Sequence, residues 1–433
     1  MGIDVLRAEG RAFQQAAAEV AVFAPRHRTV GAFTGGRLSL DSGPALDLSG
    51  LDYLALGSDP TVKALMAGAL TEHDCAIPGS EAVIRTAQVR ELEDELARFH
   101  LGTGTAITFS AGYAANFALM EALGLRTGSH FLQLHRDAFP PPVSAAVPTV
   151  FFLDGDLHFS ARHGVRFARR LRPAGCRAVT YRAGEPEHLA ELLRRSRRTD
   201  GAHALRVIVT DTVESATGRE FDMAALCALA ESYDCLLYAD EAHAVGVLGP
   251  QGRGVTAKVP GFERYRDRLI VMGTLTKALC QPGGYAAMTD PSVAALLRFC
   301  SPQHVFSAPV APWVAAATVR ILDLVAGPYG EARRRRLADL TSYAHRRLRD
   351  AGFEPVSADP TPILAVPLRE PRLGERVLEF LARLGYVVSV FQAPLMPVGR
   401  EVVRIGLRAD LAEDDVDGLV EALRRCRKEL AFG

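Results

Sequence analysis

The sequence predicts an α/β protein in which a mostly parallel central sheet carries helices on both faces, followed by a smaller C-terminal α+β domain. From about residue 51 to 300, short apolar runs typical of buried strands alternate with segments of helical periodicity. After residue 300 the pattern changes to two long helical segments followed by short apolar strands. A chain of 433 residues is long enough for one large and one small domain.

The expected elements follow one another in a regular order. Residues 1–50 are expected to form an N-terminal helix and arm, with a short strand near 46–48. In the large domain, 51–300, we expect helices at 91–99, 116–123 and 223–232 and strands at 106–109, 206–210 and 235–240. Residues 125–150 contain the run AFPPPVSAAVP and are interpreted as an inserted surface loop. In the small domain, 301–433, we expect helices to about 324 and 351, strands near 363, 387 and 404–407, and a final helix.

The composition argues against several classes of protein. The 50 basic and 50 acidic side chains cancel and are spread along the chain, so no nucleic-acid partner is expected. No apolar run is long enough for a membrane span, and residues 1–12 lack the apolar core of a signal peptide. The seven cysteines are scattered without a CxxC pair, which indicates neither a disulfide framework nor a zinc site. These features predict a cytoplasmic protein.

Asp240 and Lys277 are the most informative residues of the chain. Each follows a short apolar run that reads as a buried strand, and 37 residues separate them. Because the carboxyl ends of strands in a parallel α/β sheet meet along one crevice, we expect both side chains to converge there. A lysine and an acid in one crevice suit pyridoxal 5'-phosphate (PLP). The lysine forms a Schiff base with its aldehyde, and the acid keeps its ring nitrogen protonated.

Asp240 and Lys277 also allow two other interpretations. Lys277 is one of four lysines, and a surface lysine at a strand end is the structural alternative. The letters DEAH, which begin at Asp240, also mark a family of helicases. That chemistry needs a phosphate loop ending in Gly-Lys-Ser/Thr, and the sequence contains no Gly-Lys pair.

Other candidates follow predicted strands. The turn after 106–109 offers the backbone amides of Gly112 and Tyr113 to a phosphate at a helix N-terminus, and an ordinary tight turn is the alternative. His158 follows another apolar strand, where its ring is a candidate for stacking on the pyridine or for a structural histidine. His243 and Ser215 are candidate partners of the cofactor's phenolic oxygen, and Ser215 also of the substrate.

Two further residues are assigned on local grounds. Thr274 is a candidate phosphate ligand, with ordinary turn chemistry as the alternative. Arg404 stands on an apolar strand of the small domain, where a guanidinium needs an acidic partner. That partner is either a substrate carboxylate or a structural acid.

The longer motifs resemble those of the α-oxoamine synthases, a family of fold-type I PLP-dependent transferases with the aspartate-aminotransferase-like fold. The family patterns VDEAHxxGxxGxxGRG and TxxKAxGxxGGY correspond to ADEAHAVGVLGPQGRG and TLTKALCQPGGY here. Shorter correspondences are FSAGYAAN, LHFSARHG, SATG and FSAPVAP, and the family's RI pair corresponds to Arg404 and Ile405. The resemblance covers about residues 45–425.

The resemblance implies a role for each matching residue. It implies that Lys277 is the Schiff-base lysine, Asp240 the pyridine partner and His158 the stacking ring. His243 and Ser215 would flank the phenolic oxygen, and Arg404 would hold the carboxylate of an amino acid. Phosphate contacts would come from Gly112, Tyr113 and, in the FST-like segment, Ser307. The resemblance also implies a homodimer with sites at the subunit interface.

Four residues depart from the family pattern. Leu51 replaces an asparagine that helps to hold the substrate carboxylate, and Glu81 lies near the place of an arginine. Cys280 replaces a glycine after the lysine, and Ala308 replaces a threonine of the phosphate-contacting segment. Together with the 125–150 insertion, these departures predict intact cofactor chemistry and rebuilt recognition of the amino acid and the acyl donor.

The expected reaction removes a group from the α-carbon of an amino acid. The resulting carbanion attacks an acyl thioester of CoA or of an acyl carrier protein, and decarboxylation then releases an α-amino ketone. Transamination, retro-aldol cleavage and side-chain replacement are open alternatives. A non-catalytic paralogue is the rival class of protein, and the presence of Lys277 counts against it.

Overall fold

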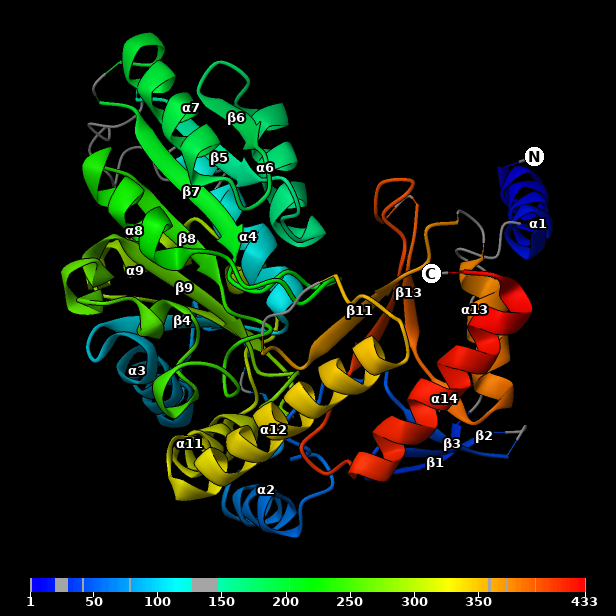
Figure 1. Cartoon of the computed structure of the whole chain (residues 1–433). Coiled ribbons are helices and arrows are strands. Elements are labelled where there is room, and N and C mark those ends of the chain that lie inside the picture. The colour runs from blue at the N-terminus through cyan, green and yellow to red at the C-terminus, as the bar shows by residue number, and fades with distance from the viewer. Residues whose placement is uncertain are drawn as a thin grey trace. The chain divides into compact units, whose positions relative to one another are not determined.

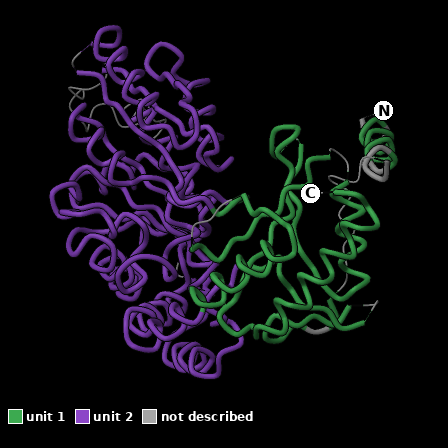
Figure 2. Tube along the Cα trace, in the orientation of Figure 1, with its two compact units in different colours: residues 1–50, 216–218, 337–433 green, residues 51–215, 219–336 purple. Residues whose placement is uncertain are grey.

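The computed structural model describes residues 2–19, 30–40, 43–77, 79–126, 147–201, 203–356, 360–370, 373–393 and 395–432. They form two compact units: unit 1 comprises residues 1–50, 216–218 and 337–433, and unit 2 comprises 51–215 and 219–336 (Figure 2). Most of the predicted insertion at 125–150 lies outside the described residues. Residues 301–336, which the sequence analysis assigned to the small domain, group with unit 2 because helix α11 (Pro312–Ala326) packs against helices α2 and α3.

Unit 2 is built on a seven-stranded sheet in the order β4-β10-β9-β8-β7-β5-β6. Strand β10 pairs antiparallel with both neighbours, and the pairs from β9 to β6 are parallel. The strands are β4 (Thr105–Phe109), β5 (Thr149–Asp154), β6 (Cys176–Tyr181), β7 (Leu205–Asp211), β8 (Leu236–Asp240), β9 (Leu269–Thr274) and β10 (Gly284–Met288). The predicted strands 106–109, 206–210 and 235–240 are confirmed within one or two residues.

The helices of unit 2 lie on both faces of this sheet (Figure 1). Every residue of β5 and β9 is buried, as expected for parallel strands covered on both sides. Helices α4 and α6 pack closely against each other and share one apolar cluster with the sheet. The helices are α2 (Pro60–Glu72), α3 (Ala87–Leu101), α4 (Gly112–Leu125), α6 (Phe159–Leu171), α7 (Pro186–Thr199), α8 (Met223–Ser232), α9 (Pro291–Phe299), α10 (Pro302–Val305) and α11. The predicted fold class is confirmed.

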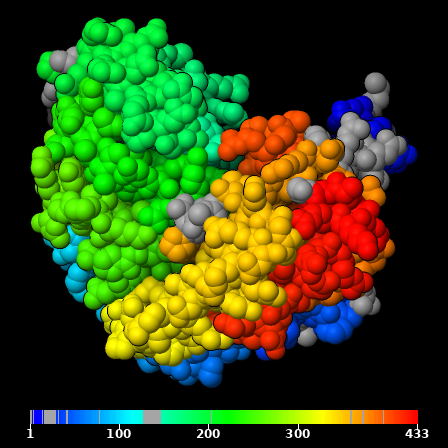
Figure 3. Space-filling model, viewed as in Figure 1, coloured from blue at the N-terminus to red at the C-terminus, as the bar shows by residue number. Residues whose placement is uncertain are grey.

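Unit 1 contains two smaller sheets, in the orders β1-β2-β3-β12 and β11-β14-β13. Their strands are β1 (Val30–Thr34), β2 (Arg37–Leu40), β3 (Gly43–Asp47), β11 (Ile363–Pro367), β12 (Tyr386–Val387), β13 (Ser389–Phe391) and β14 (Val402–Gly406). The helices are α1 (Gly2–Glu19), α13 (Gly374–Arg383) and α14 (Glu413–Leu430), and α14 forms the red surface in Figure 3. Helix α12 (Pro328–Asp350) runs from unit 2 into unit 1. No helix in the described part of the chain is long and apolar enough to cross a membrane.

Candidate active site

A cavity of about 220 Å³ in unit 2 brings most of the predicted site residues together. Its wall is formed by the carboxyl ends of β7, β8 and β9 and by the N-terminal ends of α4 and α6. Eight predicted residues line it: Gly112, Tyr113, His158, Ser215, Asp240, His243, Thr274 and Lys277. Ser307 is half-buried and is not part of this wall, and Arg404 is buried on β14 in unit 1.

Asp240, the last residue of β8, is held by two N–H donors. Its Oδ2 accepts from the Nδ2 of Asn116 at 2.7 Å, and its Oδ1 accepts from the backbone N–H of Ala242 at 2.9 Å. The orientation of the Asn116 amide is set by Tyr238, whose hydroxyl donates to Asn116 Oδ1 at 2.7 Å. The Asp240 carboxyl group is therefore held in one orientation. Asn116 was missed by the sequence analysis, although it lies within the FSAGYAAN motif.

Lys277 belongs to a short chain of polar contacts. Its Nζ lies 2.7 Å from Nε2 of His243, and Nδ1 of His243 lies 2.7 Å from the hydroxyl of Tyr53. Tyr53 is fully buried, so this series of polar contacts ends on a side chain held in the protein interior. When Lys277 is protonated, its ammonium donates to Nε2, and the neutral imidazole donates from Nδ1–H to the Tyr53 oxygen. The amine is therefore aimed by two buried or nearly buried rings.

His158 caps the N-terminus of α6 and is anchored at both ends. Its backbone N–H donates to Oδ2 of Asp211 at 3.1 Å, and its Nδ1 lies 2.6 Å from Oγ of Ser160. That hydroxyl also accepts from Asn116 at 3.0 Å, which links His158 to the Asp240 cluster. Removal from water and the positive charge of Lys277 lower the pKa of His158, and the charge of Asp240 opposes this. The cavity therefore favours a neutral imidazole.

Asp211 is a cavity residue that the sequence analysis missed. It ends β7 and pairs in register with Asp240 on β8. Its Oδ1 is buried and has no hydrogen-bond partner in the part of the chain that the structure describes. Burial, together with the charges of Asp240 and Asp154, raises the pKa of Asp211 well above its ordinary value. The signal was present, because Asp211 follows the apolar run RVIVT in the same way that Asp240 follows its own strand.

The part of the cavity formed by the N-terminus of α4 and by Thr274 and Thr276 is suited to an anion. Within the described residues α4 has no side-chain N-cap, and the first amide N–H groups of a helix lack an intrahelical partner. Gly112 and Tyr113, at this N-terminus, line the cavity. A Cβ on Gly112 would lie 3.1 Å from Cβ of Thr274, so the glycine allows the close approach of this turn. The Oγ1 atoms of Thr274 and Thr276 lie 2.7 Å apart at the same end. The cavity therefore combines an amine, a carboxylate and anion donors, which match the aldehyde, ring nitrogen and phosphate of PLP.

Two of the departures from the family pattern have defined surroundings. Cys280 has a φ of +53°, a left-handed conformation that favours glycine, and its Sγ lies 3.1 Å from Oδ1 of Asp52. Leu51, which directly precedes Asp52 in the sequence, is half-buried. Asp52 also accepts the backbone N–H groups of Leu56 and Gly57, at 2.8 and 3.0 Å. This loop is therefore tied to the segment that carries Lys277.

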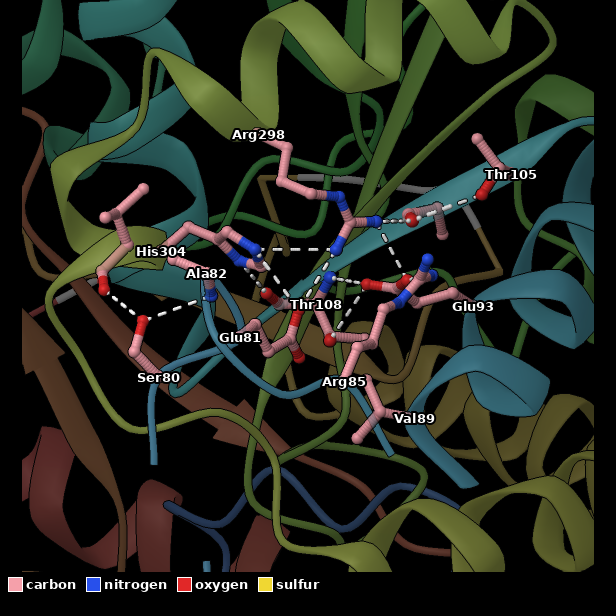
Figure 4. A network of polar contacts seen from close by, with 12 residues as sticks. Ser80, Glu81, Ala82, Arg85, Val89, Glu93, Thr105, Thr108, Arg298 and His304 are labelled. Carbon is pink, nitrogen blue, oxygen red and sulfur yellow. Dashed lines mark hydrogen bonds and ion pairs between the residues drawn. The ribbon is translucent and has the colours of Figure 1, made fainter. Parts of the chain in front are cut away.

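Glu81 belongs to a separate polar network, shown in Figure 4. Arg298 of α9 lies 3.0 Å from Oε2 of Glu81 and 2.8 Å from Oε2 of Glu93. Arg85 forms a second ion pair with Glu93, and Nε2 of His304 lies 3.2 Å from Glu81 Oε2. Burial and the charge of Arg298 lower the pKa of His304 to about 4. The structure thus places Glu81 in a network that joins the loop before α3 to α9 and β4.

The chain matches known proteins over most of its length. The family model for aminotransferase class I and II matches residues 166–423. The 8-amino-7-oxononanoate synthase of Geobacter sulfurreducens is 33% identical over 409 residues, 94% of each chain. The enzyme of that name from Gluconacetobacter diazotrophicus is 33% identical over 393 residues, which is 90% of this chain and 89% of the relative.

Solved structures share the fold. Serine palmitoyltransferase from Sphingomonas wittichii superposes with a TM-score of 0.81 at 23% identity, covering 99% of this chain and 98% of that one. The 8-amino-7-oxononanoate synthase of Francisella tularensis superposes with a TM-score of 0.67 at 21% identity, covering 89% and 98%. A further serine palmitoyltransferase of this fold was solved with PLP.

Fold and cavity together define a fold-type I PLP-dependent transferase. Within that class, the chain belongs to the aminotransferase class I and II family and, more narrowly, to its α-oxoamine synthases. The resemblance drawn from the sequence motifs is confirmed.

Proposed function

We propose that this enzyme condenses an amino acid with an acyl thioester, of CoA or of an acyl carrier protein, and releases an α-amino ketone after decarboxylation. The observation that carries the proposal is the cavity in which the Lys277 amine, 2.7 Å from His243, shares a wall with the Asp240 carboxylate. The names of the relatives support it, since 8-amino-7-oxononanoate synthase and serine palmitoyltransferase both belong to this class of enzyme.

The residues of the cavity divide the work between binding and proton transfer. When bound, PLP supplies the electron sink that makes a carbanion at the amino acid's α-carbon accessible. Lys277 would bind its aldehyde, and its Nζ, when free as an amine, would accept or return a proton at the substrate α-carbon. His243, held by Tyr53, keeps that nitrogen in place. Asp240, held by Asn116, would accept a hydrogen bond from the N–H of the pyridine ring.

The remaining assignments concern orientation. In this proposal the His158 ring covers one face of the cofactor, and Ser215 and His243 contact its phenolic oxygen. Phosphate contacts are assigned to Gly112, Tyr113, Thr274 and Ser307. Arg404 is kept as the predicted ligand of the substrate carboxylate. We further propose that the enzyme is a cytoplasmic homodimer with its sites at the subunit interface.

The test is a product analysis with the purified, PLP-loaded enzyme. A panel of amino acids is combined with acyl-CoA substrates of several chain lengths, and the products are identified by mass spectrometry. We expect free CoA and an amino ketone in equal amounts, with neither formed by the Lys277→Ala variant. A keto acid or an aldehyde that forms without release of CoA would instead establish transamination or cleavage.

A further inference from the structure

Helix α6 carries an exposed apolar stripe that the proposed chemistry does not use. Phe159, His163, Phe167 and Leu171 follow one another at intervals of four residues, so they lie along one face of the helix. The exposed fractions of Phe159, Phe167 and Leu171 are 56%, 37% and 45%. Side chains of this size are seldom left exposed in a row without a partner. We call these four residues, with Tyr113 and Phe117, the aromatic stripe.

Helix α4 completes the stripe from the side. Tyr113 and Phe117 are also four residues apart, and both meet His163. The ring centroid of His163 lies 5.0 Å from that of Phe117 and 5.5 Å from that of Phe159. Phe117 in turn lies 5.5 Å from Phe167. These spacings are those of interacting aromatic pairs, so the rings form one continuous surface.

A hydrogen bond removes the main polar interruption of this surface. The Tyr113 hydroxyl lies 2.5 Å from Nδ1 of His163. The two groups hydrogen-bond to each other, which reduces the polarity that the Tyr113 hydroxyl and Nδ1 of His163 present to an apolar ligand. The exposed side chains of Arg166 and Arg170 flank the stripe on α6 without occupying its positions.

The stripe begins at the active-site cavity. Tyr113 lines that cavity and also contacts His163, and Phe159 directly follows the cavity residue His158. From Phe159 to Phe167 the helix advances by about 12 Å, at a rise of roughly 1.5 Å per residue. An apolar chain whose reacting end lies in the cavity would therefore find a contact surface of that length directly beside the cavity.

We propose that the aromatic stripe binds the acyl chain of the thioester substrate. This inference rests on the proposed function, because it assigns the stripe to the acyl donor of that reaction. Each methylene laid on the rings removes apolar surface from water on both partners, so affinity should rise with chain length. Among donors with the same head group, the stripe would favour medium and long saturated chains over acetyl.

The test measures binding of acyl-CoA to the PLP-loaded enzyme without an amino acid, so that no turnover occurs. Dissociation constants for acetyl-, octanoyl- and lauroyl-CoA are determined by calorimetry for the wild type and for a Phe159→Ala/Phe167→Ala double variant. We expect a loss of at least tenfold for lauroyl-CoA, a smaller loss for octanoyl-CoA and no change for acetyl-CoA. Phe33→Ala, which removes a ring of 58% exposure on β1, is the matched control and should change none of these values.

Further measurements decide between occupants. A Phe159→Leu/Phe167→Leu variant keeps an apolar surface and should recover most of the lauroyl-CoA affinity. An equal loss for all three thioesters, or no loss, would overturn the inference. So would a fall in molecular mass by light scattering in the double alanine variant, since it would make the stripe a contact between two copies of the chain.

Failure of this inference is distinguishable from failure of the proposed function. If the wild type forms the amino ketone but the double variant keeps the same chain-length preference, the stripe has no role and the reaction stands. If the wild type binds no acyl-CoA and forms no ketone, the proposed function itself is wrong.

Discussion

Unit 2 contains two clusters of buried acids that differ in how their charge is compensated. In the network around α9, Glu93 and Glu81 are both paired with Arg298, and Arg85 supplies a second cation. At the carboxyl ends of β5, β7 and β8, a buried aspartate ends each strand: Asp154, Asp211 and Asp240. Among the described residues, none of these three aspartates forms an ion pair, and the hydrogen-bond donors to their carboxyl oxygens are amide N–H groups.

The difference shows why burial of an acid is a weak indication of function. Paired acids and arginines can be retained for structure alone, since removing one member leaves an uncompensated buried charge. Asp211 and Asp240 instead line a cavity that contains one amine, and within the described residues Oδ1 of Asp211 has no hydrogen-bond partner. Burial also raises the pKa of Asp154. A cavity lined by two carboxyl groups and one amine is the arrangement expected of a site that binds a charged group.

The largest effect should follow from removing the amine of the cavity. Lys277→Ala removes both the group that binds the aldehyde and the group that moves the proton, so we expect amino ketone formation to fall by at least about 10³-fold. Borohydride reduction should add the mass of PLP to the wild type and not to the variant. Lys63→Ala, an exposed lysine on α2, is the control. Wild-type protein without the added mass would contradict the assignment.

Removing Arg298 from its ion-pair network should lower the stability of the protein. Arg298→Ala leaves Glu81 and Glu93 without their shared cation, so we expect the free energy of unfolding to fall by about 3–5 kcal/mol. The control is Arg320→Ala, which breaks an exposed pair with Glu72 and should change the free energy of unfolding far less. Urea denaturation of both variants measures the difference. Equal losses of stability in the two variants would show that the network around Arg298 stabilises the fold no more than an exposed ion pair does.

Arg404 tests whether a buried arginine outside the network serves the substrate. It is buried on β14 between β11 and β13. If it holds the substrate carboxylate, Arg404→Lys keeps the charge but loses the planar fork, and amino-acid binding should weaken by about 2–3 kcal/mol. Absorbance of the bound cofactor and thermal stability should stay unchanged. Lower stability with unchanged amino-acid affinity, by spectral titration, would make Arg404 structural.

The sequence predicted the strand-end residues more completely than their partners. Asp240 and Lys277 were recognisable because each follows an apolar run, and a parallel sheet brings such positions together. Asn116 and Tyr53 were not predicted as site residues, because their contacts join segments more than a hundred residues apart. Such pairs depend on how helices and loops pack, and local sequence patterns do not encode that packing. The network around Arg298 was missed for the same reason, with only Glu81 noted as a departure.

The pH dependence of stability should differ between a variant of Asp211 and a variant of Glu93. The pKa of Asp211 is raised in the folded state by burial and by the charges of Asp240 and Asp154. A raised pKa favours folding while the acid is neutral, and this contribution is lost as the pH rises through the folded-state pKa.

Above the unfolded-state pKa of an aspartate, the folded wild type must either ionise the buried Asp211 or keep it protonated, and Asp211→Asn has neither cost. We expect Asp211→Asn to be more stable than the wild type at pH 8, by on the order of 1 kcal/mol, with the advantage shrinking toward pH 5. Glu93→Gln should instead destabilise the protein at both pH values, because Glu93 accepts from Thr108, Arg85 and Arg298, and an amide has one acceptor oxygen. Thermal unfolding at the two pH values checks both variants. If Asp211→Asn is less stable than the wild type and the gap persists at pH 5, Asp211 is an ionised, compensated carboxylate and the contrast between the two clusters fails.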